Sequence, residues 1–512
     1  MSNRSEKYLY NTIFTALLQV VTIISGFVVP KIMLKYYGSE INGLVTSITQ
    51  FISYFNLVEA GLSGAAIYAL YKPLADRDTN QVSRIVAASK RFYIQSGYVF
   101  TALTIVLAFL YPLYISTEHY SSLWIAFLVI VLGSNGFLEF FTLSKYRVLL
   151  TADQKTYVVS IASLIQIGVQ MLIIAFLSPL HINVVWVRAI AVVAILLRSV
   201  ILWAYCKRNY PEVDYTAEPD TKALNKRWDA LFLQVLGAIH KGTPVVLLTV
   251  IVKDLALISI YSVFHVVVGG LSSILGIFES GLAASFGEII ARNQKQTLQK
   301  AYTEFEFVFY SLMGMLFSVA FIMIIPFVAL YTVDVHDANY NMPIVAYMML
   351  LDGFLYHSKT PQGMLVIAAG MYKETKWRSF TQGMIALVGG AILAIPFGIY
   401  GILAAAILSN VYRAIDIWYF SNRYITGLSP KQSVNHFFIA VIEVLLIVLP
   451  FVFIDIVCST WFEWLFAACA VSFYAIMVVG IVSMIFKRQL TKNVCKRVRG
   501  ILLRKSRWRE SK

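Results

Sequence analysis

Ionisable side chains inside long apolar segments are the residues of this 512-residue chain that could do chemistry. Each such charge costs about 2.5–3.5 kcal/mol at the centre of a bilayer, so it should face a cavity or a partner. The basic and polar candidates for substrate binding are Lys241, Lys359, Arg413, Arg198 and His357. A cavity lined by such cations would suit an anionic substrate group, such as a diphosphate.

Two lysines lie deepest in their segments. Lys241 is in the middle of an apolar run at 231–251, where its ammonium group cannot easily snorkel to water. Lys359 follows Asp352 by seven residues, so the two side chains share one helix face with Tyr356 between them. We expect both lysines to line a cavity.

The two arginines have a simpler alternative. Arg413 stands three residues before Asp416 and can pair with it, and Arg198 lies about two helical turns from the nearer membrane edge. Snorkelling or a structural ion pair is therefore an open alternative to substrate binding for both. Three histidines within apolar segments could either pack helices through hydrogen bonds or bind a ligand: His240, His265 and His357.

Carboxylates in the same segments could bind a coupling cation. Glu139, Glu443 and Asp352 are the candidates for proton or ion coupling. Glu59 and Glu279 lie near the ends of their segments, where a structural role beside basic loops or helix N-termini is an alternative to ion coupling. We expect no bound metal or other cofactor, since the four cysteines show no metal-ligand spacing.

One short phrase, Glu-x-Gly-Leu, follows an apolar run twice, at 59–62 and at 279–282. The spacing is close to half the chain, which predicts two related lobes with a transport site between them. The glycines of the phrase allow close helix contact. The structural markers of the repeat are Glu59, Gly61, Glu279 and Gly281.

The elements that must position these residues are membrane helices. The chain is 59% hydrophobic and 13% charged, whereas a soluble domain carries about 25% charged residues. Apolar runs of about 20 residues, enough to cross a bilayer, recur throughout. We expect an all-α integral membrane protein with about 14 transmembrane helices, near 11–34, 42–69, 93–115, 122–144, 157–177, 184–205, 231–251, 257–278, 307–331, 343–368, 379–396, 399–420, 435–455 and 462–486.

The net charge of +15 follows from topology rather than from nucleic-acid binding. Lysine and arginine gather in alternate loops and in the C-terminal tail, whereas the opposite loops offer little beyond Lys35 and Lys253. This positive-inside pattern predicts that both termini are cytoplasmic. We expect the tail to lie on anionic lipid, with a specific protein or RNA contact as the alternative.

The expected division of the chain has two six-helix lobes and two added helices. A polar segment between the sixth and seventh spans is typical of a linker. The segments are a first lobe, a linker, a second lobe, a pair of C-terminal helices and a polybasic tail: 1–206, 207–230, 231–422, 423–486 and 487–512. After each Glu-x-Gly-Leu phrase we expect an interfacial helix, at 77–93 and 292–305, with an ordinary solvated helix as the alternative.

Signatures of common enzymes are missing from the sequence. It has no Walker A loop, no HExxH helix and no serine nucleophile elbow. The longest loop on the outer side, about 332–342, leaves no room for a catalytic domain. We therefore expect no enzyme activity and no ATP-driven pump within this one chain. A membrane-embedded glycan polymerase or glycosyltransferase is the least favoured alternative.

The chain resembles the multidrug/oligosaccharidyl-lipid/polysaccharide (MOP) flippase superfamily, and within it the bacterial polysaccharide transporter (Wzx-type) branch. The resemblance covers nearly the whole chain. Its motifs are Tyr36-Tyr37-Gly38, Asn42-Gly43-Leu44, Gly61-Leu62 followed by a basic stretch from Lys72, and Ile260-Tyr261-Ser262 followed by the apolar stretch at 279–287. The related lipid II flippases place arginines in the first span, whereas this chain has Gln19 within it and Lys31 at its end.

The resemblance implies a flippase for polyprenyl-diphosphate-linked oligosaccharides in the bacterial cell membrane, working by alternating access as part of surface polysaccharide biosynthesis. The implied partners are the lipid-linked oligosaccharide, membrane lipids and other polysaccharide-assembly proteins, with the chain itself a monomer. A diphosphate with about two negative charges gains roughly 4.6 kcal/mol on moving outward through 100 mV, so transport without ATP is reasonable. A drug or cation antiporter of the same superfamily is the first rival.

Overall fold

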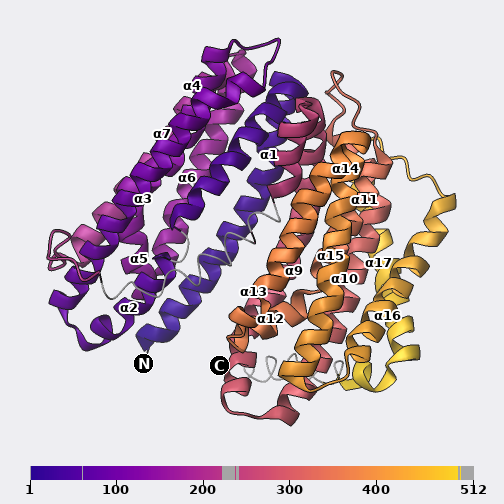
Figure 1. Cartoon of the computed structure of the whole chain (residues 1–512). Helices are drawn as coiled ribbons and strands as arrows, with labels where there is room; N and C mark the ends of the chain where they lie inside the picture. Colours follow the sequence, from indigo (N-terminus) through magenta and orange to yellow (C-terminus); the bar gives the residue numbers. More distant parts are fainter. Residues whose placement is uncertain (1, 60–61, 222–236, 238–241, 494–495, 497–512) are drawn as a thin grey trace. The chain divides into compact units, whose positions relative to one another are not determined.

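Every regular element in the part of the chain that the structure describes is a helix (Figure 1). The structure is a computed structural model, and it describes residues 2–59, 62–221, 237, 242–493 and 496. The chain forms two compact units, called unit 1 and unit 2, which comprise 1–262 with 334–338 and 263–333 with 339–512. The lobe and linker boundaries expected from the sequence stay a prediction.

Unit 1 is built of long helices that pack against one another. Helix α1 packs against α6, α6 against α7, and α3 against α4. The short helix α2 packs on α3 and α5. The elements are α1 (Ser2–Phe55), η1 (Asn56–Glu59), α2 (Leu62–Asp76), α3 (Thr79–Tyr114), α4 (Ser122–Leu138), η2 (Glu139–Leu143), α5 (Ser144–Ala152), α6 (Thr156–Leu177), η3 (Ser178–Leu180), α7 (Val184–Asn209) and η5 (Leu248–Val252).

Unit 2 is built around α15 and α10. Helix α15 packs against α11, α13 and α14, while α10 packs against α11, α16 and α17. The elements are α9 (Leu255–Ala291), whose first residues belong to unit 1, then α10 (Lys295–Tyr331), α11 (Pro343–His357), α12 (Thr360–Ala368), α13 (Tyr372–Met384), η6 (Ile385–Gly389), α14 (Gly390–Phe397), α15 (Ile399–Ser421), η7 (Asn422–Thr426), α16 (Pro430–Val448), η8 (Leu449–Phe453) and α17 (Trp461–Phe486).

The described residues contain 11 helices long and apolar enough to cross a membrane. Three of the expected 14 spans account for the difference. The first two expected spans fall in one helical run, Leu9–Asp76. Of the seventh span, the described residues include only a short apolar helix, Gly242–Val252. The tenth span is divided between α11 and α12. The expected turn between the eleventh and twelfth spans is present, because Gly398 adopts φ 54° between α14 and α15.

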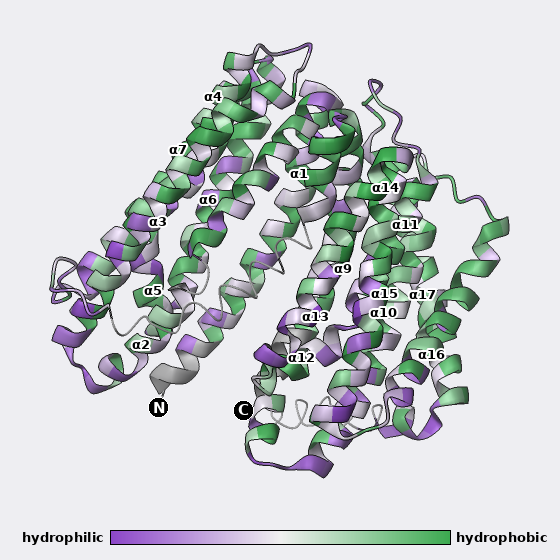
Figure 2. Ribbon diagram, viewed as in Figure 1, coloured by the Kyte–Doolittle hydropathy of each residue, from purple (hydrophilic) through white to green (hydrophobic). Residues whose placement is uncertain are grey.

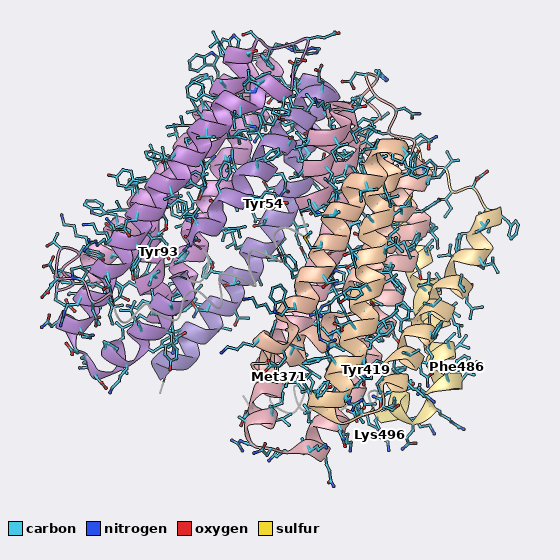
Figure 3. All side chains as sticks on the ribbon, in the orientation of Figure 1. Tyr54, Tyr93, Met371, Tyr419, Phe486 and Lys496 are labelled. Carbon is cyan, nitrogen blue, oxygen red and sulfur yellow. The ribbon has the colours of Figure 1, made fainter. Side chains whose placement is uncertain are left out.

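Large apolar side chains lie exposed on the helices of both units, which water would not tolerate but lipid does. Phe109, Ile395 and Phe466 are 73%, 79% and 72% exposed. Figure 2 shows hydrophobic residues along the lengths of helices such as α4 and α16, with hydrophilic residues mainly at loops and helix ends. Figure 3 shows side chains covering the helices of each unit. The chain is a multi-pass membrane protein.

The motif Tyr36-Tyr37-Gly38 makes the kink that divides α1. Gly38 has φ 79°, a left-handed conformation that glycine adopts without a steric penalty. The helix restarts at Ser39, whose backbone N–H and hydroxyl donate to the Asp337 carboxylate at 2.6 and 2.7 Å. The Tyr37 hydroxyl donates to the carbonyl of Ile182 at 2.8 Å. This motif therefore fixes the direction of the second half of α1.

The second half of α1 packs closely on the segment before and within α9. A Cβ atom added at Gly43 would lie 1.8 Å from the carbonyl oxygen of Leu255, so glycine alone fits this contact. Beside it, the Asn42 amide donates to the hydroxyl of Ser259 at 2.8 Å, and the Ser47 and Thr249 hydroxyls lie 2.7 Å apart. Small and polar side chains thus hold these two segments together.

The prediction of two interfacial helices is wrong. The stretch at 77–93 runs into the long helix α3, and the stretch at 292–305 into α10, so neither forms a separate amphipathic helix. The faces that we expected to lie in the headgroup plane are buried in protein, with Ile85 2% and Tyr302 0% exposed. Burial against neighbouring helices gives the same periodic pattern of apolar residues as burial in lipid, so the sequence alone does not distinguish these two environments.

The first part of the expected linker is docked on unit 1. The carbonyl of Tyr215 accepts a hydrogen bond from Lys90 on α3, and the backbone N–H of Asp214 donates to Ser83. The Tyr210 hydroxyl donates to Asp153, the residue after α5. Burial alone would raise the pKa of the Asp153 carboxyl, but hydrogen bonds and nearby lysines, including Lys155, outweigh it and lower that pKa.

Candidate functional site

Lys359 lies at a helix break in unit 2. Helix α11 ends at His357 and α12 begins at Thr360, with Pro361 in the first turn of α12. The ammonium of Lys359 donates to the side-chain oxygen of Asn410 at 2.8 Å and lies 4.4 Å from the centre of the Tyr356 ring. The break places a cation against the amide of Asn410 and the ring of Tyr356, with the Asp352 carboxylate near enough to interact with it electrostatically.

Asn410 connects this cation to Asp352. Its side-chain amide donates to the Asp352 carboxylate at 2.8 Å, while its oxygen also accepts from the Gln382 amide at 3.1 Å. Asp352 and Lys359, which the sequence placed on one helix face, are thus joined through a third residue from α15. Nothing about Asn410 in the sequence alone marked it, because its partners are about 50 residues away.

A second cationic group lies on α13 and α15. Arg413 donates to the Asp416 carboxylate at 2.7 Å, which is the pairing expected from their spacing. Arg378 from α13 pairs with the other oxygen of the same carboxylate and lies 5.3 Å from the centre of the Phe420 ring. The side chain of Arg413 is 7% exposed and that of Arg378 38% exposed. Two guanidinium groups therefore share one carboxylate, and the trio carries a net positive charge.

His357 and Glu443 occupy buried packing positions in unit 2. The Nε2 atom of His357 lies 2.9 Å from the Ser272 hydroxyl on α9. One oxygen of Glu443 accepts long hydrogen bonds from Ser311 on α10 and Ser483 on α17, at 3.3 and 3.4 Å. The same two serines line an apolar groove of about 300 Å³ between α10 and α17. The proposed role of Glu443 in ion coupling stays a prediction.

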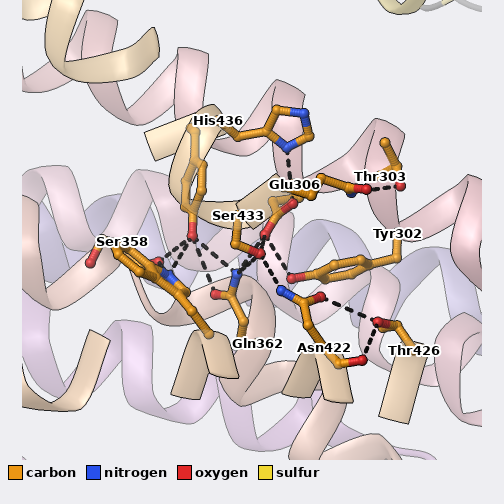
Figure 4. Close-up of polar contacts among 12 residues, drawn as sticks. Tyr302, Thr303, Glu306, Ser358, Gln362, Asn422, Thr426, Ser433 and His436 are labelled. Atoms are coloured by element: carbon orange, nitrogen blue, oxygen red, sulfur yellow. Dashed lines mark hydrogen bonds and ion pairs between the residues drawn. The ribbon is translucent and has the colours of Figure 1, made fainter. Parts of the chain in front are cut away.

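A fully buried polar network in unit 2 was missed from the sequence (Figure 4). Glu306 on α10 is 0% exposed and accepts hydrogen bonds from Tyr302 at 2.8 Å and Gln362 at 2.6 Å. Ser433 donates to the same oxygen, and His436 Nδ1 lies 2.9 Å from the other oxygen. The network joins α10, α12 and α16. Glu306 is flanked by apolar residues in the sequence, which could have indicated a buried carboxylate. It was overlooked because the expected span at 307–331 begins one residue after it.

A four-residue charged cluster, called the Arg147 cluster, lies in unit 1. Arg147 on α5 donates to both oxygens of Glu59, at 2.9 and 3.1 Å, and to Glu139 at 2.7 Å. Arg198 on α7 has Nη1 3.9 Å from the same Glu139 oxygen and 3.3 Å from Gln166. The sequence had marked Glu59, Glu139 and Arg198 separately. Arg147 lies between Lys145 and Lys155 in a basic stretch of the sequence, and nothing in that stretch indicated its central position.

Several expected residues are not placed by the structure. Lys241, His240 and Gly61 lie outside the described residues. Glu279 and Gly281 lie within α9, which continues to Ala291, and Glu59 is the last residue of η1. Across the described residues, no three His, Cys, Asp or Glu side chains gather in a way that could hold a metal ion.

Solved structures with a similar helical arrangement include membrane transporters. An inward-facing multidrug resistance MATE family transporter of the MOP superfamily matches with a TM-score of 0.66, 14% identity, and coverage of 79% of this chain and 95% of that one. The lipid II flippase MurJ in an inward closed conformation matches with a TM-score of 0.64, 13% identity, and coverage of 94% and 99%.

A MOP superfamily transporter from Pyrococcus furiosus, described as having a binding pocket of reverse polarity, matches with a TM-score of 0.57 and 14% identity, over 83% of this chain and 94% of that one. No family model matches the sequence. No curated protein matches it either. At these identities the likeness concerns the fold. The chain has the fold of the membrane transporters of the MOP superfamily.

Proposed function

We propose that the protein is a secondary transporter that flips polyprenyl-diphosphate-linked oligosaccharides from the inner to the outer leaflet of a bacterial cytoplasmic membrane, by alternating access. The observation that carries this proposal is that Arg378 and Arg413 share the carboxylate of Asp416. Guanidinium groups bind phosphate oxygens in bidentate geometry, so a diphosphate can supply the negative charge that this trio lacks.

Lys359 supports the same substrate class. The amide oxygen of Asn410 and the ring of Tyr356 are neutral, and a charged phosphate oxygen makes the stronger hydrogen bond to an ammonium group. The helix break at 358–359 also leaves Lys359 at a point where the backbone departs from a regular helix. Broken helices line the binding sites of many secondary transporters.

The comparisons are consistent with lipid flipping. The lipid II flippase MurJ, by its description a transporter of a lipid, aligns with 94% of this chain, whereas the multidrug transporter aligns with 79%. In the structure from Pyrococcus furiosus, reversed pocket polarity is taken to suggest a different function. Pocket charge is thus a reasonable guide to substrate class in this fold, and the unit 2 trio is basic.

The remaining parts of the proposal follow from the flippase assignment. Both termini would lie in the cytoplasm, as the distribution of lysine and arginine predicts. The partners would be the lipid-linked oligosaccharide, bulk membrane lipid and other polysaccharide-assembly proteins, with the transporter a monomer. No enzyme activity is proposed, and the solved relatives named above are transporters.

A MATE-type antiporter of cationic compounds is the second candidate. The highest of the TM-scores given above, 0.66, belongs to a multidrug transporter. Asp352 is a half-buried carboxylate and Glu443 a buried one, and both could bind a cationic substrate or coupling ion. The two candidates differ in the sign of the substrate charge, which makes them separable by experiment.

The test in the native host is deletion of the protein followed by localisation of its labelled lipid-linked oligosaccharide. We expect the labelled glycan to accumulate in the inner leaflet, where enzymes added from outside cannot reach it, and surface polysaccharide to be lost. Complementation with wild type should restore delivery, whereas Arg413→Gln, which leaves Asp416 in place, should restore it poorly. Undiminished delivery in the deletion strain, with increased sensitivity to cationic drugs, would favour the antiporter.

A further inference from the structure

The Arg147 cluster is more accessible than a purely structural ion pair needs to be. The side chains of Arg147, Glu59 and Glu139 are 23%, 24% and 30% exposed. Arg147 lies five residues before the end of α5, about 8 Å along the helix from the loop at 153–155. That loop is on the side predicted to be cytoplasmic, where a new lipid-linked substrate is made available.

The charges of the cluster balance only while both carboxylates are ionised and in place. Arg147 holds three hydrogen bonds to carboxylate oxygens, whereas Arg198 reaches Glu139 only at 3.9 Å. The Nε atom of Arg198 is buried and has no hydrogen-bond partner among the described residues. One donor is therefore unsatisfied beside Glu139, and a ligand with several acceptor oxygens would satisfy it.

Both carboxylates come from irregular backbone. Glu59 is the last residue of the short 3-10 element η1, and Glu139 is the first residue of the π-helical turn η2. π-helical turns inside helices are frequent at functional sites. These positions let each glutamate move away from Arg147 with little displacement of a long helix, since the regular hydrogen-bond pattern is already interrupted there.

We propose that the Arg147 cluster is an anion-exchange site, in which the diphosphate group of the substrate displaces Glu59 and Glu139 from Arg147 and Arg198. The identification of the diphosphate with that of a polyprenyl-linked oligosaccharide rests on the proposed function. The exchange of anions is argued from the geometry of the cluster alone. Phosphate oxygens take over the guanidinium hydrogen bonds, including the unsatisfied Nε of Arg198. No covalent bond forms or breaks.

The exchange couples binding to proton uptake. A carboxylate that leaves a guanidinium group for an apolar surrounding is stabilised by taking a proton from solution. The other groups near these carboxylates are the phenol of Tyr93 on α3, the amide of Gln166 on α6 and the two guanidinium groups. Protons taken up with the substrate would be released when the carboxylates return to Arg147, which gives the transporter a route to proton coupling.

The experiment uses the full-length protein in nanodiscs and inorganic diphosphate as the probe. Binding is measured by titration calorimetry in buffers of different ionisation enthalpy, which report proton uptake. Because diphosphate itself gains or loses protons on binding, the readout is the difference between variants: we expect wild type to take up about one proton more per diphosphate than Glu139→Gln, Glu139→Gln to bind about tenfold tighter, and Arg147→Gln to bind at least about tenfold weaker. Glu288→Gln, in the exposed pair with Arg292, is the matched control and should change nothing.

Two results would overturn the inference: no tighter binding by Glu139→Gln and Glu59→Gln than by wild type, or proton uptake by wild type no greater than that by the glutamine variants. The glutamine variants keep the side-chain shape, so a merely structural role would leave both readouts unchanged. Failure of the proposed function would look different. Diphosphate binding and proton uptake would follow the pattern above, while the protein would move no polyprenyl-linked oligosaccharide across a bilayer.

Discussion

Replacing Lys359 with alanine is expected to reduce transport of the diphosphate-linked substrate by about 10- to 100-fold, because a hydrogen bond to a charged group contributes roughly 1.5–3 kcal/mol. The lysine sits at the break between α11 and α12 and is held by Asn410 and Tyr356. Removing its ammonium group leaves the Asn410–Asp352 hydrogen bond possible, so unit 2 should stay folded. Transport is measured as delivery of labelled glycan to the outer leaflet, normalised to membrane abundance.

The control for Lys359→Ala is Lys207→Ala. Lys207 also lies over an aromatic ring, 5.1 Å from that of Trp203, but it is exposed in the last turn of α7. We expect no change in transport from this variant. Lys359→Arg should retain part of the activity, since it keeps the charge but not the geometry. Full activity of Lys359→Ala would show that this cation does not bind the substrate.

Replacing Glu306 with alanine is expected to destabilise the protein by about 3–5 kcal/mol, because several buried polar groups lose their acceptor and each such loss costs about 1–3 kcal/mol. Its two oxygens accept from Tyr302, Gln362 and Ser433 and contact His436, and each of these groups would be left buried without its acceptor. The measurement is the midpoint of thermal unfolding in detergent. The stabilising role is structural, so substrate affinity per folded molecule should change little.

Glu288→Gln serves as the stability control, because its salt bridge to Arg292 is more than 60% exposed on both sides. Exposed pairs of this kind contribute about 0–1 kcal/mol. An unfolding midpoint for Glu306→Ala equal to that of Glu288→Gln would mean that the network does not hold α10, α12 and α16 together.

Hydropathy and charge distribution predicted much of this fold, because a bilayer requires long apolar helices and these are visible in a single sequence. Less visible were the places where helices stop. The break at 358–359 carried a signal in Pro361, since proline favours the first turn of a helix, but the apolar run across it masked the break. The kink at Gly38 depends on Asp337, which is 298 residues from Ser39.

The candidate site was only partly predictable for the same reason. The Arg413–Asp416 pair is three residues apart on one helix and follows from helix geometry. Arg378 and Arg147 pair with carboxylates 38 and 88 residues away along the chain, and a single sequence does not show which residues so far apart are in contact. Both arginines lie near basic loops, where the positive-inside pattern already accounts for them. Their pairing with carboxylates was therefore not expected.

Transport by purified protein in liposomes is the direct test of whether the substrate is an anionic lipid-linked glycan. The liposomes would carry a fluorescent polyprenyl-diphosphate oligosaccharide in one leaflet. A membrane potential would be imposed that is positive on the side of the other leaflet, which receives the substrate. An added quencher would report the fraction of the substrate that crosses. We expect protein-dependent crossing that becomes faster with the potential and is lost in Arg413→Gln and Lys359→Ala. Crossing no faster than in protein-free liposomes, together with uptake of a cationic dye, would contradict it.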